Sequence, residues 1–176
     1  ETFLAANHIH LQLITLSAFI LDGFANTAEA VVGAAYGAKS RARFDRAVRL
    51  TSEFSFGFAL ICGAMIYGFG GTIIDQLTTD PAVQNTARIY LPYCALAPVL
   101  GFAAFQLDGI FIGATKGAEM RNGMFFSTCS FFAVFYLAEG LGNHALWMAM
   151  LSFMAMRGIT LAVMLQYQWR RGTFLA

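Results

Sequence analysis

The sequence predicts an all-α fold, a polytopic bundle of transmembrane helices. Hydrophobic residues make up 58% of the 176 residues and charged residues only 12%, whereas soluble domains carry about 25% charged residues. Mean hydropathy is +0.61. Five apolar stretches approach or exceed the roughly 20 residues that a spanning helix needs, and they cover residues 11–37, 50–74, 89–114, 123–141 and 145–169. A soluble core would not repeat such a stretch five times.

The first stretch carries a polar stripe. Its polar residues are Thr15, Asp22, Asn26 and Glu29. They fall within about 60° of one another on a helix with 3.6 residues per turn. Because polar groups are costly in lipid, we expect the stripe to face other helices or a cavity.

A basic segment separates the first stretch from the second, and we expect it to form a short amphipathic anchor at the lipid headgroups. The second stretch is rich in Phe and Gly. The third stretch follows Thr78-Thr-Asp-Pro81, which is a helix-capping signal. Pro92 and Pro98 predict a kink or local unwinding in its outer half.

Small residues predict close packing later in the third stretch. Gly109, Gly113 and Gly117 repeat every four residues, a spacing that lets two helix backbones approach each other. The fourth stretch is rich in Phe and carries few polar groups. We expect it to face lipid or to serve in packing.

Asp108 is the strongest candidate for a functional residue. It is the only charge in the run from Gly101 to Gly113, and a carboxylate near mid-membrane is penalised by roughly 2.5 to 3.5 kcal/mol even on the milder scales. Such a group faces a protein interior or a watery cavity. Arg157, in the middle of the fifth stretch, needs a partner or water for the same reason.

A rise of 1.5 Å per residue allows the depths of these groups to be compared. Asp22 and Arg157 then lie near mid-membrane, whereas Glu29 and Asp108 lie in the inner half. One hypothesis is that Asp108, with Asp22 or Glu29, binds a proton or a metal cation, and that Arg157 is the counter-ion of one acid. The alternative is that all three acids are structural. Thr15 and Asn26 are expected to bond neighbouring helices.

The basic residues predict the orientation. Nine of the eleven Lys and Arg residues lie in three places on one side of the predicted spans: Lys39, Arg41, Arg43, Arg46 and Arg49; Lys116 and Arg121; Arg170 and Arg171. The positive-inside rule puts this side, and the C-terminus, in the cytoplasm. Because the chain opens outside with Glu1 and no signal peptide, we expect it to be the tail of a larger polytopic protein.

Several classes of function lack support in the sequence. A net charge of +1 gives no electrostatic basis for nucleic-acid binding. The three cysteines fall in apolar stretches without paired spacing or nearby His, so we predict no metal site. We find no nucleophile beside a base and no phosphate loop, so we predict neither an enzyme nor a cofactor other than a coupling ion.

Several sequence segments resemble those of the multidrug and toxic compound extrusion (MATE) transporters, and the DinF-like branch in particular. They are Leu21-Asp-Gly-Phe-Ala-Asn-Thr-Ala-Glu-Ala30, Val32-Gly-Ala-Ala-Tyr-Gly-Ala38, Leu107-Asp-Gly-Ile-Phe-Ile-Gly-Ala-Thr115, Glu119-Met-Arg-Asn122, Gly142-Asn-His-Ala-Leu-Trp147 and Arg157-Gly158. These segments are long and ordered, and the similarity covers essentially the whole chain.

The resemblance implies a twelve-helix antiporter of two six-helix lobes in the inner (plasma) membrane. It would export organic, often cationic, drug-like compounds against a proton or sodium gradient. This chain would supply helices eight to twelve of the C-terminal lobe, with the N-terminal lobe and helix seven outside it. The helix-ten Asp, a cation ligand in a sodium-coupled branch of the family, falls on Asp108.

Two alternatives remain. A lipid-linked oligosaccharide flippase of the wider superfamily would carry more cationic residues in its cavity, and Arg157 is the only basic residue within a predicted span. A non-transporting scaffold or truncated fragment is the second, because five spans cannot form both halves of an alternating-access cavity.

Overall fold

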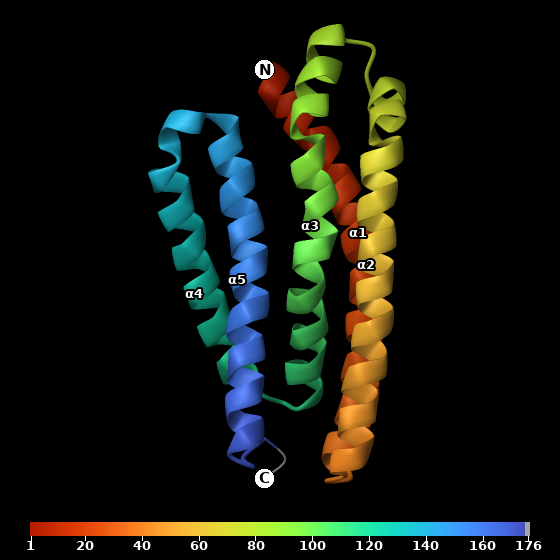
Figure 1. The fold of residues 1–176 in the computed structure, drawn as a ribbon, viewed down its shortest axis with the longest axis vertical. Coiled ribbons are helices and arrows are strands. Elements are labelled where there is room, and N and C mark those ends of the chain that lie inside the picture. Colours follow the sequence, from red (N-terminus) through yellow and green to blue (C-terminus); the bar gives the residue numbers. More distant parts are fainter. Residues whose placement is uncertain (175–176) are drawn as a thin grey trace.

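The computed structural model describes residues 1–174 and confirms the all-α class. The helices run up and down along one long axis, joined by short turns (Figure 1). They are α1 (Thr2–Gly37), α2 (Arg41–Leu77), α3 (Pro81–Gly113), α4 (Gly117–Leu137) and α5 (Asn143–Arg170), with a short 3-10 helix, η1 (Glu139–Leu141), before α5. The N-terminus and the described C-terminal end lie at opposite ends of the bundle (Figure 1).

Four of the described helices, α1, α2, α3 and α5, are long and apolar enough to cross a membrane. The helix in the fourth predicted span differs from them. α4 has 21 residues, and its first two turns are polar because they contain Glu119, Arg121 and Asn122. Its apolar part ends at Leu137, where the chain turns into η1 instead of continuing to residue 141 as the sequence predicted.

The helices begin earlier than the apolar pattern predicts. α1 starts at Thr2 instead of residue 11, α2 at Arg41 instead of 50, α3 at Pro81 instead of 89 and α4 at Gly117 instead of 123, whereas α5 starts within two residues of its predicted position. The basic segment between the first two spans is therefore the first turns of α2. Ala, Arg and Leu are good helix formers, so nothing in this segment interrupts the helix.

The capping signal before α3 is confirmed. The Asp80 side chain accepts a hydrogen bond of 2.8 Å from the backbone N–H of Ala82, and Pro81 occupies the first turn. α3 then runs as one helix through Pro92 and Pro98, so the local unwinding predicted there is not observed.

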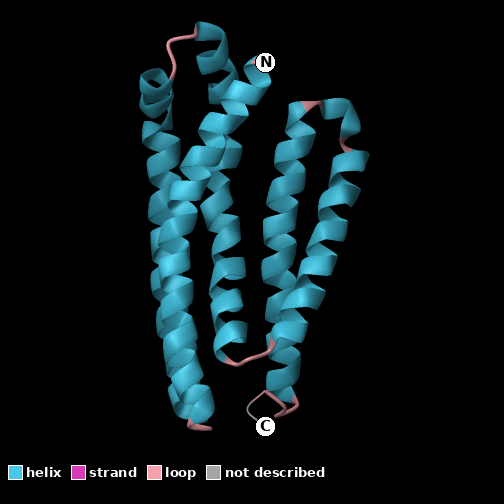
Figure 2. Cartoon of the chain, turned by 180° about the vertical axis from the view of Figure 1, so that it is seen from behind, coloured by secondary structure: helices cyan, strands magenta, loops and turns pink. Residues whose placement is uncertain are grey.

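α3 is the central helix of the bundle. It packs against α1, α2 and α5, whereas α4 packs mainly against α5. Seen from behind, α1 crosses the bundle at an angle and the hairpin of α4 and α5 stands beside it (Figure 2). The molecule thus consists of a three-helix group, α1 to α3, and a two-helix hairpin that contacts this group mainly through α5.

The predicted glycine face brings α1 and α3 into backbone contact. A side chain on Gly109 would collide with the carbonyl group of Ala25, and a Cβ on Gly113 would lie 2.5 Å from the carbonyl oxygen of Glu29. Gly117 does not join this face because it begins α4 and has open space around it. Two of the three glycines therefore pack as predicted.

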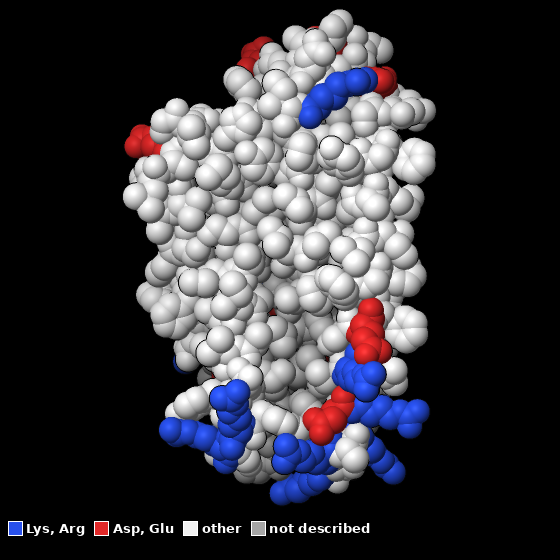
Figure 3. Space-filling model, in the orientation of Figure 1, with Lys and Arg blue, Asp and Glu red and all other residues white. Residues whose placement is uncertain are grey.

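The buried residues form one cluster at each end of the bundle. The cluster at the end that holds the N-terminus includes Tyr90, Cys94 and Trp147, and the cluster at the basic end includes Phe111 and Leu161. Large apolar side chains also cover much of the outside, as expected where the solvent is lipid. Figure 3 shows this uncharged surface, with most Lys and Arg side chains gathered at one end.

Candidate functional site

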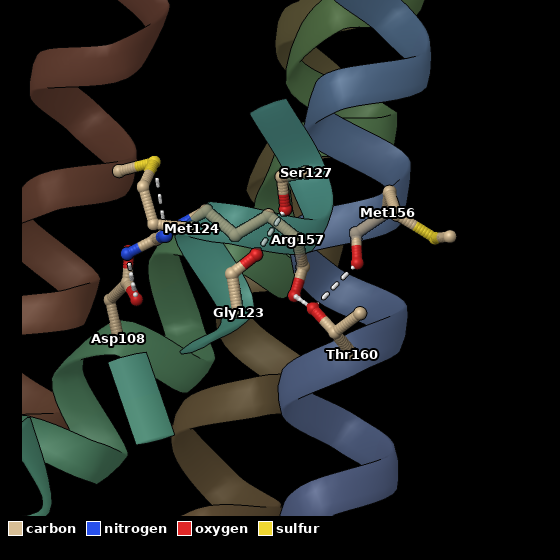
Figure 4. A network of polar contacts seen from close by, with 7 residues as sticks. All are labelled: Asp108, Gly123, Met124, Ser127, Met156, Arg157 and Thr160. Carbon is tan, nitrogen blue, oxygen red and sulfur yellow. Dashed lines mark hydrogen bonds and ion pairs between the residues drawn. The ribbon is translucent and has the colours of Figure 1, made fainter. Parts of the chain in front are cut away.

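Asp108 on α3 and Arg157 on α5 form an ion pair inside the bundle. The Arg157 Nε donates to Asp108 Oδ2 at 2.9 Å, and Nη2 donates to Oδ1 at 2.7 Å. Two nitrogens thus meet two oxygens in a fork, the geometry in which guanidinium and carboxylate bind best. Figure 4 shows the Arg157 side chain reaching across from α5 to Asp108.

Close packing of α3 and α5 places this pair. A Cβ on Gly158 would lie 2.9 Å from the Cβ of Ala103, so only glycine allows α5 to come this near to α3. Arg157 projects from the adjacent position. Its Nη1 also donates to the sulfur of Met124 at 3.5 Å, so α4 completes the surroundings of the guanidinium (Figure 4).

The pair is largely shielded from solvent. The Arg157 side chain is 10% exposed and that of Asp108 is 24% exposed. Removing one member of such a pair leaves an uncompensated charge and typically costs about 3 to 5 kcal/mol. Each charge is therefore compensated only by the other. Any event that changes the charge of Asp108 acts directly on the contact between α3 and α5.

The polar stripe on α1 lies elsewhere. The side chains of Thr15, Asp22 and Asn26 are exposed, and Glu29 is half-buried. Within residues 1–174, no hydrogen bond or ion pair engages the side chain of any of the four. The stripe therefore does not bond to the other described helices, whereas the sequence predicted such bonds for Thr15 and Asn26.

The three candidate acids thus differ in surroundings. Asp108 is paired with Arg157, so the counter-ion predicted for one acid belongs to this one. Asp22 remains without an ion pair in the described chain and adds a like charge to the surroundings of Asp108. Among residues 1–174, no group of three or more His, Cys, Asp or Glu side chains is arranged to hold a metal ion.

The structure also reveals polar contacts that the sequence analysis missed. At the end of the bundle that holds the N-terminus, Asn7 and Asn143 exchange hydrogen bonds of 2.7 and 3.0 Å, and Trp147 Nε1 donates to Asn7 at 3.0 Å. Nearer the basic end, Gln106 donates to Thr51 and links α3 to α2. The amide side chains in or beside the apolar stretches could have predicted these contacts, because a buried amide needs a hydrogen-bond partner.

Long apolar helices packed around a shielded carboxylate–guanidinium pair are typical of a polytopic membrane protein, in which a buried charge needs a partner. The chain belongs to the MATE family of membrane transporters, since the MatE family profile matches residues 1–138. It is 38% identical over 173 residues to DNA damage-inducible protein F of Escherichia coli (strain K12), with 98% of the chain covered. The predicted resemblance to the DinF-like branch is thus confirmed.

Two plant proteins are also similar. Protein DETOXIFICATION 43 of Arabidopsis thaliana is 29% identical over 160 residues, covering 90% of the chain, and Protein DETOXIFICATION 42 is 27% identical over 162 residues, covering 89%. The chain spans 38% of the length of the E. coli relative and 30% and 31% of the two plant relatives. All three relatives are therefore much longer than these 176 residues.

Proposed function

We propose that the chain is part of the C-terminal lobe, five of its six helices, of a cation-coupled antiporter that exports organic, often cationic compounds in exchange for protons or sodium ions. Family membership supports the transporter class. The observation that carries the coupling proposal is the shielded Asp108–Arg157 fork, because it joins two helix groups through one titratable carboxylate. The other partners are the lipid bilayer and an N-terminal lobe of the same protein.

Competition for Asp108 is the proposed coupling step. A proton or cation that binds the carboxylate displaces the charge it shares with Arg157 and weakens the link between α3 and α5. The link re-forms when the ion leaves. Such binding shifts the balance between inward- and outward-facing states only if the two states differ in affinity for the ion. Asp22, which is exposed on α1, or Glu29, which is half-buried on the same helix, is the proposed second acid.

The proposed location is the inner (plasma) membrane, with the C-terminus in the cytoplasm. The support is the gathering of basic side chains at the end of the bundle where α5 finishes (Figure 3). Positive residues favour the cytoplasmic side of a membrane protein.

The flippase alternative is disfavoured by the same ion pair. A lipid-linked oligosaccharide carries phosphate, which calls for free cationic groups in the cavity. Among the Lys and Arg side chains of residues 1–174, only Arg157 is buried, and its charge is already matched by Asp108.

Efflux from proteoliposomes tests the proposal. The full-length protein is reconstituted and loaded with a fluorescent organic cation, and efflux is followed under a proton gradient and, separately, a sodium gradient. We expect one gradient to drive efflux in the wild type and Asp108→Asn to reduce it to the level of protein-free liposomes. The effective gradient identifies the coupling ion.

Asp75→Asn is the matched control, because it removes an equivalent carboxylate from the exposed Asp75–Arg88 pair. We expect this variant to keep wild-type efflux. Full efflux by a folded Asp108→Asn protein would contradict the coupling role of Asp108, and a wild type without any efflux would contradict the antiporter proposal itself.

A further inference from the structure

An apolar groove opens beside the basic end of the bundle. It lies between the first turns of α2 and the last turns of α5, has a volume of about 520 Å³, and has Leu107 of α3 among its lining residues. Figure 3 shows a hollow just above the cluster of Lys and Arg side chains. Its volume is within the range of about 300 to 1,000 Å³ that is typical of ligand pockets.

The groove changes character along its length. Away from the basic end it is lined by aliphatic groups, among them Val163 and Leu165 of α5. At the basic end it meets Phe44 and Trp169, whose rings stack with centroids 4.9 Å apart. Tryptophan at the end of a spanning helix is characteristic of the headgroup level of a bilayer. The apolar part therefore extends to the depth of lipid acyl chains.

Two arginines with free N–H groups lie at the basic end of the groove. Arg49 is one of its lining residues, and Arg41 lies against Trp169 on the side of an adjoining pocket. The Arg41 guanidinium lies 4.8 Å from the centre of the Trp169 ring, and its closest carboxylate contact, with Asp45, is 4.0 Å. Arg49 donates its Nε to Glu53, which leaves its other N–H groups free of this bond. Both arginine side chains are at least 70% exposed, so their free N–H groups can meet an anion.

We propose that this groove binds an anionic phospholipid from the leaflet at the basic end. An acyl chain would occupy the apolar part beside Val163 and Leu165, and the phosphate would lie between Arg41 and Arg49. Guanidinium groups bind phosphate well because their N–H donors match its oxygens. This site is separate from the Asp108–Arg157 pair and is independent of the transport proposal.

Charge and depth together favour a lipid over other occupants. A second protein helix would match the apolar lining but not the exposed arginines at the basic end, and a free phosphate would leave the apolar part uncovered. An anionic phospholipid matches both, and it is present at this depth wherever the protein is in a membrane. Glu53 accepts one hydrogen bond from Arg49, and Asp45, which also lines the groove, lies 4.0 Å from Arg41, so both arginines keep N–H groups that a phosphate can use.

Tryptophan quenching tests the site. These 176 residues contain two tryptophans, Trp147 in the cluster at the end that holds the N-terminus and Trp169 in the groove. In the full-length protein, every tryptophan except Trp169 is replaced by phenylalanine, and the protein is reconstituted in vesicles that contain either brominated phosphatidylglycerol or brominated phosphatidylcholine at equal mole fraction. We expect stronger quenching by the brominated phosphatidylglycerol.

Charge variants show whether the preference belongs to the groove. We expect Arg41→Gln and Arg49→Gln each to lower the preference for phosphatidylglycerol about fivefold, the usual effect of one basic residue at an anionic surface. Arg121→Gln is the matched control, because it removes an exposed arginine of α4 that does not line the groove. We expect it to keep the preference.

Three results would overturn the proposal. Equal quenching by the two lipids would mean that the groove does not select an anionic headgroup. An equal loss of preference in Arg121→Gln would assign it to the basic end as a whole. Absence of quenching by either lipid would mean that another part of the protein covers Trp169.

Discussion

Two arginine–aspartate pairs in this chain have the same chemistry and opposite surroundings. Arg157 and Asp108 meet inside the bundle through two nitrogens, with side chains 10% and 24% exposed. Arg88 and Asp75 meet near the start of α3 and the end of α2, where one nitrogen, Nη2, lies 2.6 Å from both oxygens. Their side chains are 51% and 43% exposed.

The difference shows that surroundings decide the energetic role of an ion pair. The exposed pair gains little, because polar solvent can stabilise each charge when the pair opens. The shielded pair has no such alternative, so each partner depends on the other. Only the shielded pair, Arg157 with Asp108, can therefore transmit a change in charge to the packing of helices.

The largest expected effect comes from removing the buried guanidinium. Arg157→Gln leaves the Asp108 carboxylate without its counter-ion, and we expect the free energy of unfolding to fall by about 3 to 5 kcal/mol. Denaturant titration of the purified protein in detergent would measure it. The double variant Asp108→Asn/Arg157→Gln removes both charges and is expected to lose less than Arg157→Gln alone. If Arg157→Gln lowered the free energy of unfolding by less than about 1 kcal/mol, the shielded pair would contribute no more than the exposed one, and the contrast would be lost.

A smaller effect is expected from the glycines beside the two pairs. A Cβ on Gly158 would lie 2.9 Å from Ala103, so Gly158→Ala pushes α5 away from α3 and is expected to cost about 1 to 3 kcal/mol. A Cβ on Gly71 would lie 4.0 Å from the Arg88 guanidinium carbon, an ordinary contact. Gly71→Ala is therefore the control, expected to be neutral or to stabilise by up to about 1 kcal/mol. Thermal unfolding of both variants would show whether only the shielded pair requires close helix packing.

The smallest effect is expected at the exposed pair. Arg88→Gln should lower the free energy of unfolding by less than about 1 kcal/mol. Because salt screens exposed charges over about 8 Å at physiological ionic strength, the difference from the wild type should shrink as salt is added. Denaturant titrations at low and high salt would measure it. A loss of several kcal/mol that persists at high salt would remove the contrast between the two pairs.

The sequence predicted the helices better than their ends. Apolar length identified all five helical regions, and Asp80 with Pro81 marked the start of α3 correctly. The beginning of α2 was missed because hydropathy detects lipid contact, whereas its first turns are basic and continue the helix outside that contact. Hydropathy thus marks the part of each helix that contacts lipid, whereas the helix itself extends as far as its backbone hydrogen bonds continue.

The site was predicted in part. Composition alone made Asp108 and Arg157 notable, but their pairing was left open because the rise per residue gives depth and not the direction in which a side chain points. Depth in fact favoured Asp22 as a match for Arg157, whereas the structure pairs Arg157 with Asp108. The rotation of each helix depends on contacts such as Gly158 with Ala103, which join residues far apart in the chain.

The glycine contacts between α1 and α3 have a mechanical consequence. Where side chains separate two helices, a change of rotamer lets one helix slide past the other. At Gly109 and Gly113 the α3 backbone rests directly on the carbonyl groups of α1, so no rotamer change can absorb a shift. We therefore expect α1 and α3 to move together as one rigid unit, and any displacement among the described helices to occur where the hairpin of α4 and α5 contacts them.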